Sequence, residues 1–385
     1  MRVAIISSSF YPAISYGGPI SATWDIANGL AEKGIKVYVS TTNANFSTKL
    51  NVKTNIFLKY SRNLFIKYYN EEIINNLSLK FIFGVWSDIK KADFIYIQYI
   101  FNYTVFFSLL FSLILRKQVL LCPRGCLSPR ALKYKHRIKK KLWLSLFIKP
   151  LISNIIWQAS SYIEKEDILN IFKDAKIVEI ADSVICDNFS NIDPVTKLDL
   201  VYNTTNQYFS EISELFFSMG RLHEIKGFDI VIDAFSLFLK DNPNAKLIIA
   251  GSDDGYKDKL IDQISMLSIE NSVFLIGAIN FNQKQALLAN CSAFVLASEF
   301  ESFGIVIAES LASGTPVIVS NKTPWKDIES NKCGIFTENN SASFYNAFCN
   351  FKTIEFDRKN IKDYVLSNFD LKIVLNKFID LIKNK

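Results

Sequence analysis

The stretch from Ser292 to Val319 places the tightest limit on how this chain can fold. It opens with the apolar run Ala293–Ala297, which has the length of a buried strand and is followed by a polar turn. Apolar residues then recur at helical spacing until Gly314 and Pro316 end the helix, and Val317–Val319 follows as a second strand. The stretch therefore predicts a strand–helix–strand unit of a parallel α/β sheet.

The turn and the helix start in this stretch are suited to a ligand that carries both phosphate and hydroxyl groups. Backbone N–H groups at a helix start lack intrahelical partners, and the helix dipole favours an anion there. The residues at this point are Ser302, Phe303, Gly304 and Ile305. Glu301 precedes them and Glu309 follows, and carboxylates accept hydrogen bonds from sugar hydroxyls. The pattern predicts a nucleotide-sugar site, although an ordinary strand–helix–strand unit with two solvated glutamates would show the same sequence.

The composition is that of a folded protein with more than one domain. At 385 residues, 49% hydrophobic and 21% charged, the chain suits two or three domains. Its six cysteines are scattered without the spacing of a metal site, so we expect reduced thiols and a cytoplasmic protein. The N-terminal apolar run is too short for a signal peptide. The most apolar segment, Tyr103–Leu115, is about a third shorter than a membrane-spanning helix and reads as a buried helix.

Strands alternate with helices along most of the chain, which predicts parallel sheets covered by helices. A polar, Asn-rich stretch at 186–213 interrupts the pattern and is expected to connect two domains, residues 1–185 and 214–367. The expected strands of the first domain are Val3–Ser8, Ile35–Thr41, Asn55–Tyr60, Phe94–Tyr99, Val119–Pro123, Ile155–Ala159 and Ile177–Ile180. Those of the second are Leu215–Met219, Lys246–Ala250, Val273–Ile276, Ala293–Ala297, Val317–Val319 and Gly334–Thr337, and a helical tail covers Ile361–Ile382.

Glycines and cations follow several of these strands. Gly17-Gly18 lies between the first strand and a helix, a position that can hold phosphate, although turns also need glycine. Arg221, directly after Gly220, and Lys226 follow a strand of the second domain. Arginine can clamp phosphate oxygens with two hydrogen bonds and lysine adds a point charge, so this pair suits a diphosphate. The alternative is that both are ordinary surface charges.

The turn after Lys246–Ala250 contains Gly251 and two adjacent acids, Asp253 and Asp254. Adjacent acids could hold a metal ion, but no Asp-x-Asp occurs in the chain. We therefore interpret the two aspartates as solvated turn residues and expect no metal cofactor.

These motifs resemble the signature of glycosyltransferase family 4. The resemblance rests on Glu301-x7-Glu309, on Phe303-Gly304 after the first acid, and on the run 313–317, SGTPV, after the second. It implies the GT-B fold, in which two Rossmann-like domains face a central cleft and a C-terminal helix, here at about 368–385, packs back on the first domain. It also implies retaining, metal-independent transfer of a hexose-type sugar from a nucleotide diphosphate sugar.

The same resemblance assigns roles to single residues. Glu301 would hold the transferred sugar, Glu309 the ribose, and Arg221 and Lys226 the departing diphosphate. The Gly17-Gly18 loop would approach the diphosphate and the acceptor, and the segment around Gly251 would lie near the base. The implied acceptor is a lipid-linked glycan of bacterial surface-polysaccharide or O-antigen synthesis, and UDP and GDP donors both remain open.

The first domain departs from the family pattern. Where the family often has a histidine after a buried strand, the chain has Arg124, and at a second such place it has Gln158. An arginine could stabilise phosphate or acceptor but cannot act as a base. The two histidines, His136 and His223, stand in polar contexts. We therefore expect the leaving phosphate to take the acceptor proton, with electrostatic stabilisation from the protein.

A basic amphipathic stretch covers residues 130–149. It contains eight Lys or Arg, no acid, and interleaved Leu, Trp, Phe and Ile. Such a stretch is typical of peripheral contact with the anionic inner face of a membrane, and a solvated basic helix face explains it equally well. Nothing else in the chain resembles a nucleic-acid-binding module.

Two other functions are compatible with the sequence. A GT-B nucleotide-sugar epimerase would share the phosphate site but needs acid/base carboxylates and no acceptor. A non-catalytic partner subunit would keep the fold and lose the charged site, whereas all four charged residues at issue (Arg221, Lys226, Glu301 and Glu309) are present. The sugar, the base, the acceptor, the linkage and the oligomeric state are not determined by the sequence.

Overall fold

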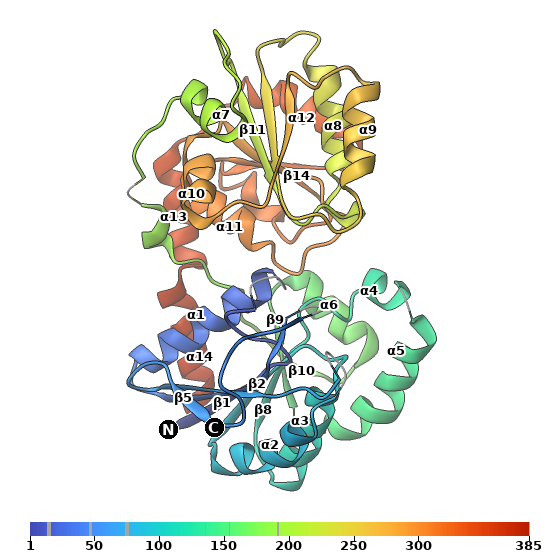
Figure 1. Cartoon of the computed structure of the whole chain (residues 1–385), viewed down its shortest axis with the longest axis vertical. Helices are drawn as coiled ribbons and strands as arrows, with labels where there is room; N and C mark the ends of the chain where they lie inside the picture. The colour runs from blue at the N-terminus through green and yellow to red at the C-terminus, as the bar shows by residue number, and fades with distance from the viewer. Residues whose placement is uncertain are drawn as a thin grey trace. The chain divides into compact units, whose positions relative to one another are not determined.

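The computed structural model describes residues 1–13, 17–45, 48–73, 77–134, 136–153, 155–190 and 192–384. Parts of four sequence expectations, namely the loop 10–19, the basic stretch 130–149, the connection 186–213 and the tail 368–385, therefore lie outside the described residues. The chain forms two compact units. The N-terminal unit comprises Met1–Ser183 and Leu371–Lys385, and the C-terminal unit comprises Val184–Asp370 (Figure 1).

The N-terminal unit is built on a sheet with the strand order β10-β9-β8-β7-β1-β2-β6-β5. Its strands are β1 (Arg2–Ile6), β2 (Lys36–Thr42), β5 (Phe57–Lys59), β6 (Leu64–Tyr69), β7 (Phe94–Gln98), β8 (Val119–Cys122), β9 (Ile155–Ala159) and β10 (Lys176–Glu179). A separate pair joins β3 (Ala44–Asn45) and β4 (Thr48–Lys49). Alternate residues of β1 enter two cores, Val3 and Ile5 on one face and Ala4 and Ile6 on the other, because successive side chains of a strand point to opposite faces.

The helices of this unit are α1 (Gly18–Glu32), α2 (Leu79–Lys91), α3 (Tyr103–Ile114), α4 (Pro129–Lys133), α5 (Arg137–Trp143), α6 (Tyr162–Ile171) and α14 (Leu371–Lys383). Helix α14 belongs to the unit although it comes from the far end of the chain. Its residues Val374, Leu375 and Phe378 join the same core as Val3 and Ile5. In the part of the chain that the structure describes, no helix is both long and apolar enough to cross a bilayer.

One expectation for the elements was wrong and a second needs refinement. The expected strand Asn55–Tyr60 is the shorter β5, which pairs antiparallel with β6, a strand that the sequence analysis missed. The polar turn between them (residues 61–63, SRN) makes a hairpin, so no crossover helix is needed. The expected helical tail Ile361–Ile382 is helical in two pieces, since it is interrupted at Phe369 and Asp370, where the chain leaves the C-terminal unit.

The C-terminal unit contains a sheet in the order β13-β12-β11-β14-β15-β16, with parallel pairing throughout its described strands. The strands are β11 (Leu215–Met219), β12 (Lys246–Ala250), β13 (Val273–Gly277), β14 (Ala293–Leu296), β15 (Val317–Ser320) and β16 (Gly334–Thr337). The strand order reverses between β11 and β14. In open α/β sheets a ligand crevice forms outside the carboxyl ends of the strands at this point.

Seven α-helices are described in this unit: α7 (Lys197–Thr205), α8 (Phe228–Phe238), α9 (Lys257–Met266), α10 (Phe281–Asn290), α11 (Ile305–Ala312), α12 (Ser341–Phe351) and α13 (Arg358–Asn368). Helix α7 lies in the polar stretch 186–213, where Thr196 caps it by accepting a hydrogen bond from the Asp199 amide. The helix contacts α10 and β13. This part of the stretch is therefore folded against the C-terminal unit.

Candidate functional site

The loops after β11 and β12 run side by side at the carboxyl edge of the C-terminal sheet. The Gly220 amide donates to the Ala250 carbonyl at 3.0 Å, and the Leu222 amide donates to the Ser252 carbonyl at 2.8 Å. A Cβ atom on Gly251 would lie 1.7 Å from the Gly220 carbonyl oxygen, so only glycine fits there. The close approach fixes the direction in which the chain leaves β11 toward Arg221.

Lys226 reaches from this loop to the first glutamate of the motif. The residue ends a 3-10 turn, Glu224–Lys226. Its side chain passes close to Gly220, where a Cβ atom would lie 3.3 Å from the lysine Cδ and Cε. Its Nζ donates to Glu301 Oε1 at 2.5 Å, and the two side chains are 19% and 12% exposed. The Glu301 carboxylate also accepts a hydrogen bond from Ser298 Oγ at 2.8 Å. Lys226 and Glu301 therefore form a largely buried pair at the topological switch point.

The helix after Glu301 starts slightly later than the sequence suggests. Helix α11 begins at Ile305, and Gly304 is its N-cap, with φ 83° in the left-handed region that favours glycine. Ser302 and Phe303 thus belong to the loop before the helix. The amides at the helix start come from Gly304 and Ile305 onward.

Glu309, the second glutamate of the motif, is paired with a lysine that the sequence analysis did not single out. Lys284 on α10 donates to Glu309 Oε1 at 2.5 Å, and the two side chains are 16% and 13% exposed. The ammonium also lies 5.2 Å from the ring centroid of Phe281. Lys284 is 25 residues from Glu309 in sequence, so no local pattern could have linked them.

Arg221 is also paired, and this pair corrects the interpretation of Asp254 as a solvated turn residue. The guanidinium donates to Asp254 Oδ2, although both side chains remain partly exposed. Asp253 stabilises the turn instead, since its carboxylate accepts hydrogen bonds from the amides of Gly255, Tyr256 and Lys257. The parallel bridge between Leu222 and Asp253 explains why the acids come to lie beside Arg221.

The C-terminal unit thus gathers three cation–carboxylate pairs around one edge of its sheet: Arg221–Asp254, Lys226–Glu301 and Lys284–Glu309. Ion pairs hold their members in defined positions, and in Lys226–Glu301 and Lys284–Glu309 they compensate charges that are largely removed from water. A ligand with a diphosphate and several hydroxyls could exchange partners with such pairs. Its phosphates would take the place of the carboxylates beside the cations, and its hydroxyls would take the place of the cations beside the carboxylates.

The three site residues expected in the first domain lie in the N-terminal unit. Gly17 is the N-cap of α1, with φ 85° and, among the described residues, no atom within 4 Å of a Cβ built on it; Gly18 is the first residue of that helix. Arg124 follows β8 and is almost completely buried, its side chain 1% exposed. Its guanidinium pairs with Asp182, and its Nε donates to Gln98 Oε1 at 2.8 Å.

The surroundings of Arg124 keep its guanidinium charged. Burial by itself would lower the pKa of the guanidinium, but the Asp182 carboxylate outweighs it, and the pKa lies well above its ordinary value. The turn at Arg124 and Gly125 has positive φ at both residues. Glu164, fully buried on α6, fixes this turn by accepting a hydrogen bond from the Gly125 amide at 2.6 Å.

Gln158, at the second family histidine position, and His223 both make structural contacts. Gln158 is buried, accepts a hydrogen bond from Tyr96 Oη at 2.7 Å and donates to the Ile180 carbonyl at 2.8 Å. His223 caps the short turn before Lys226, with its Nδ1 accepting from the Ile225 amide at 3.2 Å. His136 precedes α5 and is exposed.

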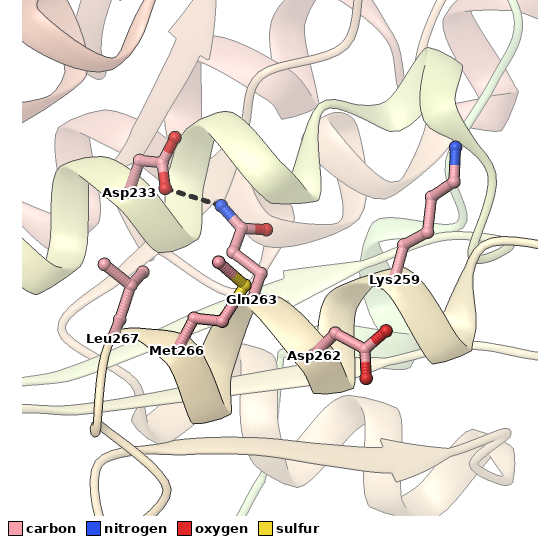
Figure 2. Close-up of a pocket in the computed structure, with 6 residues that line it drawn as sticks. All are labelled: Asp233, Lys259, Asp262, Gln263, Met266 and Leu267. Atoms are coloured by element: carbon pink, nitrogen blue, oxygen red, sulfur yellow. Dashed lines mark hydrogen bonds between the residues drawn. The ribbon is translucent and has the colours of Figure 1, made fainter.

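A shallow pocket elsewhere on the C-terminal unit is separate from these pairs. It lies between α8 and α9 and is lined by Asp233, Lys259, Asp262, Gln263, Met266 and Leu267 (Figure 2). Gln263 ties the two helices together by donating to Asp233 Oδ1 at 2.6 Å. All six lining residues come from these helices and the end of α9, so the pocket does not open at the carboxyl ends of the strands.

Comparison with known proteins gives a family match for the C-terminal unit. Residues 206–364 match the family model "Glycosyl transferases group 1", which covers less than half of the chain and includes all three ion pairs. An uncharacterised glycosyltransferase of Methanocaldococcus jannaschii is 28% identical over 184 residues, 42% of this chain and 46% of the relative. The alpha-1,3/1,6-mannosyltransferase ALG2 of Dictyostelium discoideum is 31% identical over 178 residues, 42% of this chain and 41% of the relative. The matches thus span less than half the length of each relative.

Among solved structures, HepE from Anabaena in complex with UDP superposes with a TM-score of 0.75 at 18% identity, covering 100% of both chains. At this identity the likeness concerns the fold. The expected GT-B fold, with two Rossmann-like domains of parallel strands and helices, is therefore confirmed.

Proposed function

We propose that this protein is a glycosyltransferase that moves a sugar from a nucleotide diphosphate sugar, UDP- or GDP-linked, to a hydroxyl group. The observation that carries the proposal is the cluster of three ion pairs at the switch point of the C-terminal sheet, inside the segment that matches the group 1 family model. The UDP complex of HepE supports a nucleotide as ligand.

The donor would bind by exchange of ion-pair partners. Its diphosphate would take Arg221 and Lys226 from their carboxylates and accept hydrogen bonds from the amides at Gly304 and Ile305. The released Glu301 would accept hydrogen bonds from hydroxyls of the transferred sugar, and Glu309 from the ribose. The cations keep an anionic partner in this exchange, and the Glu301 and Glu309 carboxylates keep hydrogen-bond donors, which limits the cost of removing the donor's charges from water.

The reaction we propose is metal-independent and retains the configuration of the sugar, here of the hexose type. The bond between the anomeric carbon and the diphosphate oxygen breaks, the acceptor oxygen bonds to that carbon on the same face, and the acceptor proton passes to the departing diphosphate. The protein supplies positive charge and N–H donors where negative charge develops, and such preorganised groups stabilise a transition state most effectively when water is excluded.

Nucleotide binding without metal tests this function. We expect the wild-type protein to bind UDP or GDP in the presence of EDTA by calorimetry, and Glu309→Gln to raise the dissociation constant about tenfold, because a charge-assisted contact to the ribose is lost. Glu270→Gln, on an exposed residue outside the cluster, is the matched control. The released sugar, followed by NMR during slow donor hydrolysis, should first appear in the donor's anomeric configuration. Failure of every nucleotide to bind would instead favour a non-catalytic partner subunit.

We further propose that the acceptor is a lipid-linked glycan of surface-polysaccharide or O-antigen synthesis, and that an exposed face of the N-terminal unit contacts an anionic membrane. On α5 and the π-helical turn Leu144–Ile148 that follows, Ile138, Leu142 and Leu146 are 75%, 51% and 62% exposed. Their spacing of four residues puts them on one side, with several cations in the same stretch. Exposed apolar side chains framed by lysines suit the interface of an anionic bilayer.

The membrane contact can be tested by flotation with liposomes. We expect wild-type protein to float with vesicles containing phosphatidylglycerol, and Lys139→Glu/Lys141→Glu to abolish flotation, because each lysine near such a surface contributes about 1 kcal/mol. Lys140 is left intact because its Nζ donates to the Ala131 and Tyr134 carbonyls. Lys240→Glu/Lys259→Glu, on exposed residues of the C-terminal unit, is the control of equal charge change. Equal flotation of the two double variants would contradict the proposal.

A further inference from the structure

Trp325, which is 22 residues from Phe303 in the sequence, contacts the loop before α11. It lies after β15, at the start of a 3-10 turn, and is 2% exposed. Its indole Nε1–H donates to the Phe303 carbonyl oxygen at 2.6 Å. The Phe303 ring is also buried, and its centroid lies 5.2 Å from that of Trp325.

This hydrogen bond controls the direction of the next amide. The Phe303 carbonyl and the Gly304 N–H belong to one peptide unit, which is planar, and in a trans peptide the two groups point in opposite directions. Because the carbonyl is directed at the buried indole of Trp325, the Gly304 N–H is directed away from it. The left-handed conformation of Gly304 then leads into the helix, so one hydrogen bond orients the peptide at which the proposed anion site begins.

A third aromatic ring fixes Trp325 itself. Phe369 lies with its ring centroid 5.0 Å from that of Trp325 and 5.4 Å from that of Phe303. Its backbone carbonyl accepts a hydrogen bond from the Val184 amide at 3.0 Å, which holds Phe369 in the C-terminal unit. The three rings form a packed cluster in which the indole has little freedom to turn away from the carbonyl.

We propose that Trp325 is a positioning residue for the diphosphate of the donor, acting through the Phe303–Gly304 peptide. The inference rests on the proposed function and deepens it, because it assigns the phosphate contact to an N–H group whose direction a distant side chain sets. It follows that Trp325 affects the binding of phosphate groups and leaves the binding of the nucleoside unchanged.

The test compares UDP with uridine, or GDP with guanosine, on two variants. Trp325→Phe keeps an aromatic ring and removes the N–H donor, whereas Phe369→Leu disturbs the ring cluster and keeps the donor. We expect Trp325→Phe to raise the dissociation constant of the diphosphate roughly three- to tenfold, the effect of one hydrogen bond, with the nucleoside unchanged. Because Phe369→Leu keeps the donor and only loosens the cluster around it, this variant should change the ratio of the two dissociation constants less than Trp325→Phe does.

A second measurement needs no variant. In the wild-type protein the backbone amide resonance of Gly304 should shift when the diphosphate is added and stay in place when the nucleoside is added. Three outcomes would overturn the positioning role while the proposed function stands. They are an equal loss of affinity for diphosphate and nucleoside in Trp325→Phe, no loss of affinity at all in that variant, and an unmoved Gly304 resonance. A wild-type protein that binds no nucleotide would overturn both.

Discussion

Replacing Lys226 with methionine should lower kcat/KM for the donor about a hundred- to a thousandfold, the loss expected when one preorganised group that faces developing negative charge is removed. The residue has two roles in the proposed reaction. It offers a positive charge to the departing diphosphate, and before the donor binds it compensates Glu301, to which its Nζ donates at 2.5 Å. Methionine keeps much of the side chain's apolar length and removes the charge, so Glu301, only 12% exposed, would remain without its cation.

Steady-state kinetics and calorimetry on the same preparations check this prediction. Lys226→Arg should retain only part of the activity, because it keeps the charge but replaces a compact ammonium by a larger planar guanidinium at the contact with Glu301. Lys240→Met, on an exposed helix end, controls for the removal of a lysine as such. A Lys226→Met enzyme that transfers sugar at the wild-type rate would contradict the placement of the diphosphate.

The charged residues of the C-terminal unit could be found from the sequence because each follows a recognisable strand. Arg221 and Lys226 come after one apolar run, and Glu301 and Glu309 come after another. Parallel strands present their carboxyl ends at one edge, and the reversal of strand order brings these two ends together. Local patterns of apolar residues and glycines therefore suffice to place the motif residues on one side of a sheet.

Their partners could not be found in the same way. Lys284 is 25 residues from Glu309 and Asp254 is 33 residues from Arg221, while Trp325 acts on a backbone carbonyl, which leaves no mark in the sequence. Such contacts depend on how helices and loops pack in three dimensions. Short-range periodicity carries no information about them, and the family motif names only one member of the Arg221–Asp254 pair and one member of the Lys284–Glu309 pair.

The N-terminal sheet was harder to predict from the sequence for a related reason. The expectation of parallel strands depended on an alternation of strand and helix. A polar turn and a short antiparallel neighbour break this alternation at β6, so the sequence pattern did not predict that strand. The place of Arg124 also could not be inferred, since its partner Asp182 is 58 residues away. The sequence suggested that the Arg124 guanidinium is available to a phosphate or an acceptor, whereas in the structure it is paired with the Asp182 carboxylate.

Breaking this internal pair should destabilise the N-terminal unit by about 3–5 kcal/mol, because removing one member of a buried ion pair leaves the other charged and unpaired. Arg124→Met does so directly: the arginine side chain is 1% exposed and that of Asp182 7%. Four of the five tryptophans (Trp24, Trp86, Trp143 and Trp157) belong to the N-terminal unit, so urea unfolding followed by tryptophan fluorescence reports mainly on that unit.

The double variant Arg124→Met/Asp182→Leu separates an internal anchor from a ligand contact. If the pair serves only to hold the turn after β8 to the segment at Asp182, removal of both charges should recover much of the lost free energy of unfolding, because no buried charge remains unpaired. Nucleotide affinity of the double variant should then stay close to wild type. A single Arg124→Met variant that keeps its stability and loses donor or acceptor binding would instead restore the role that the sequence suggested for this arginine.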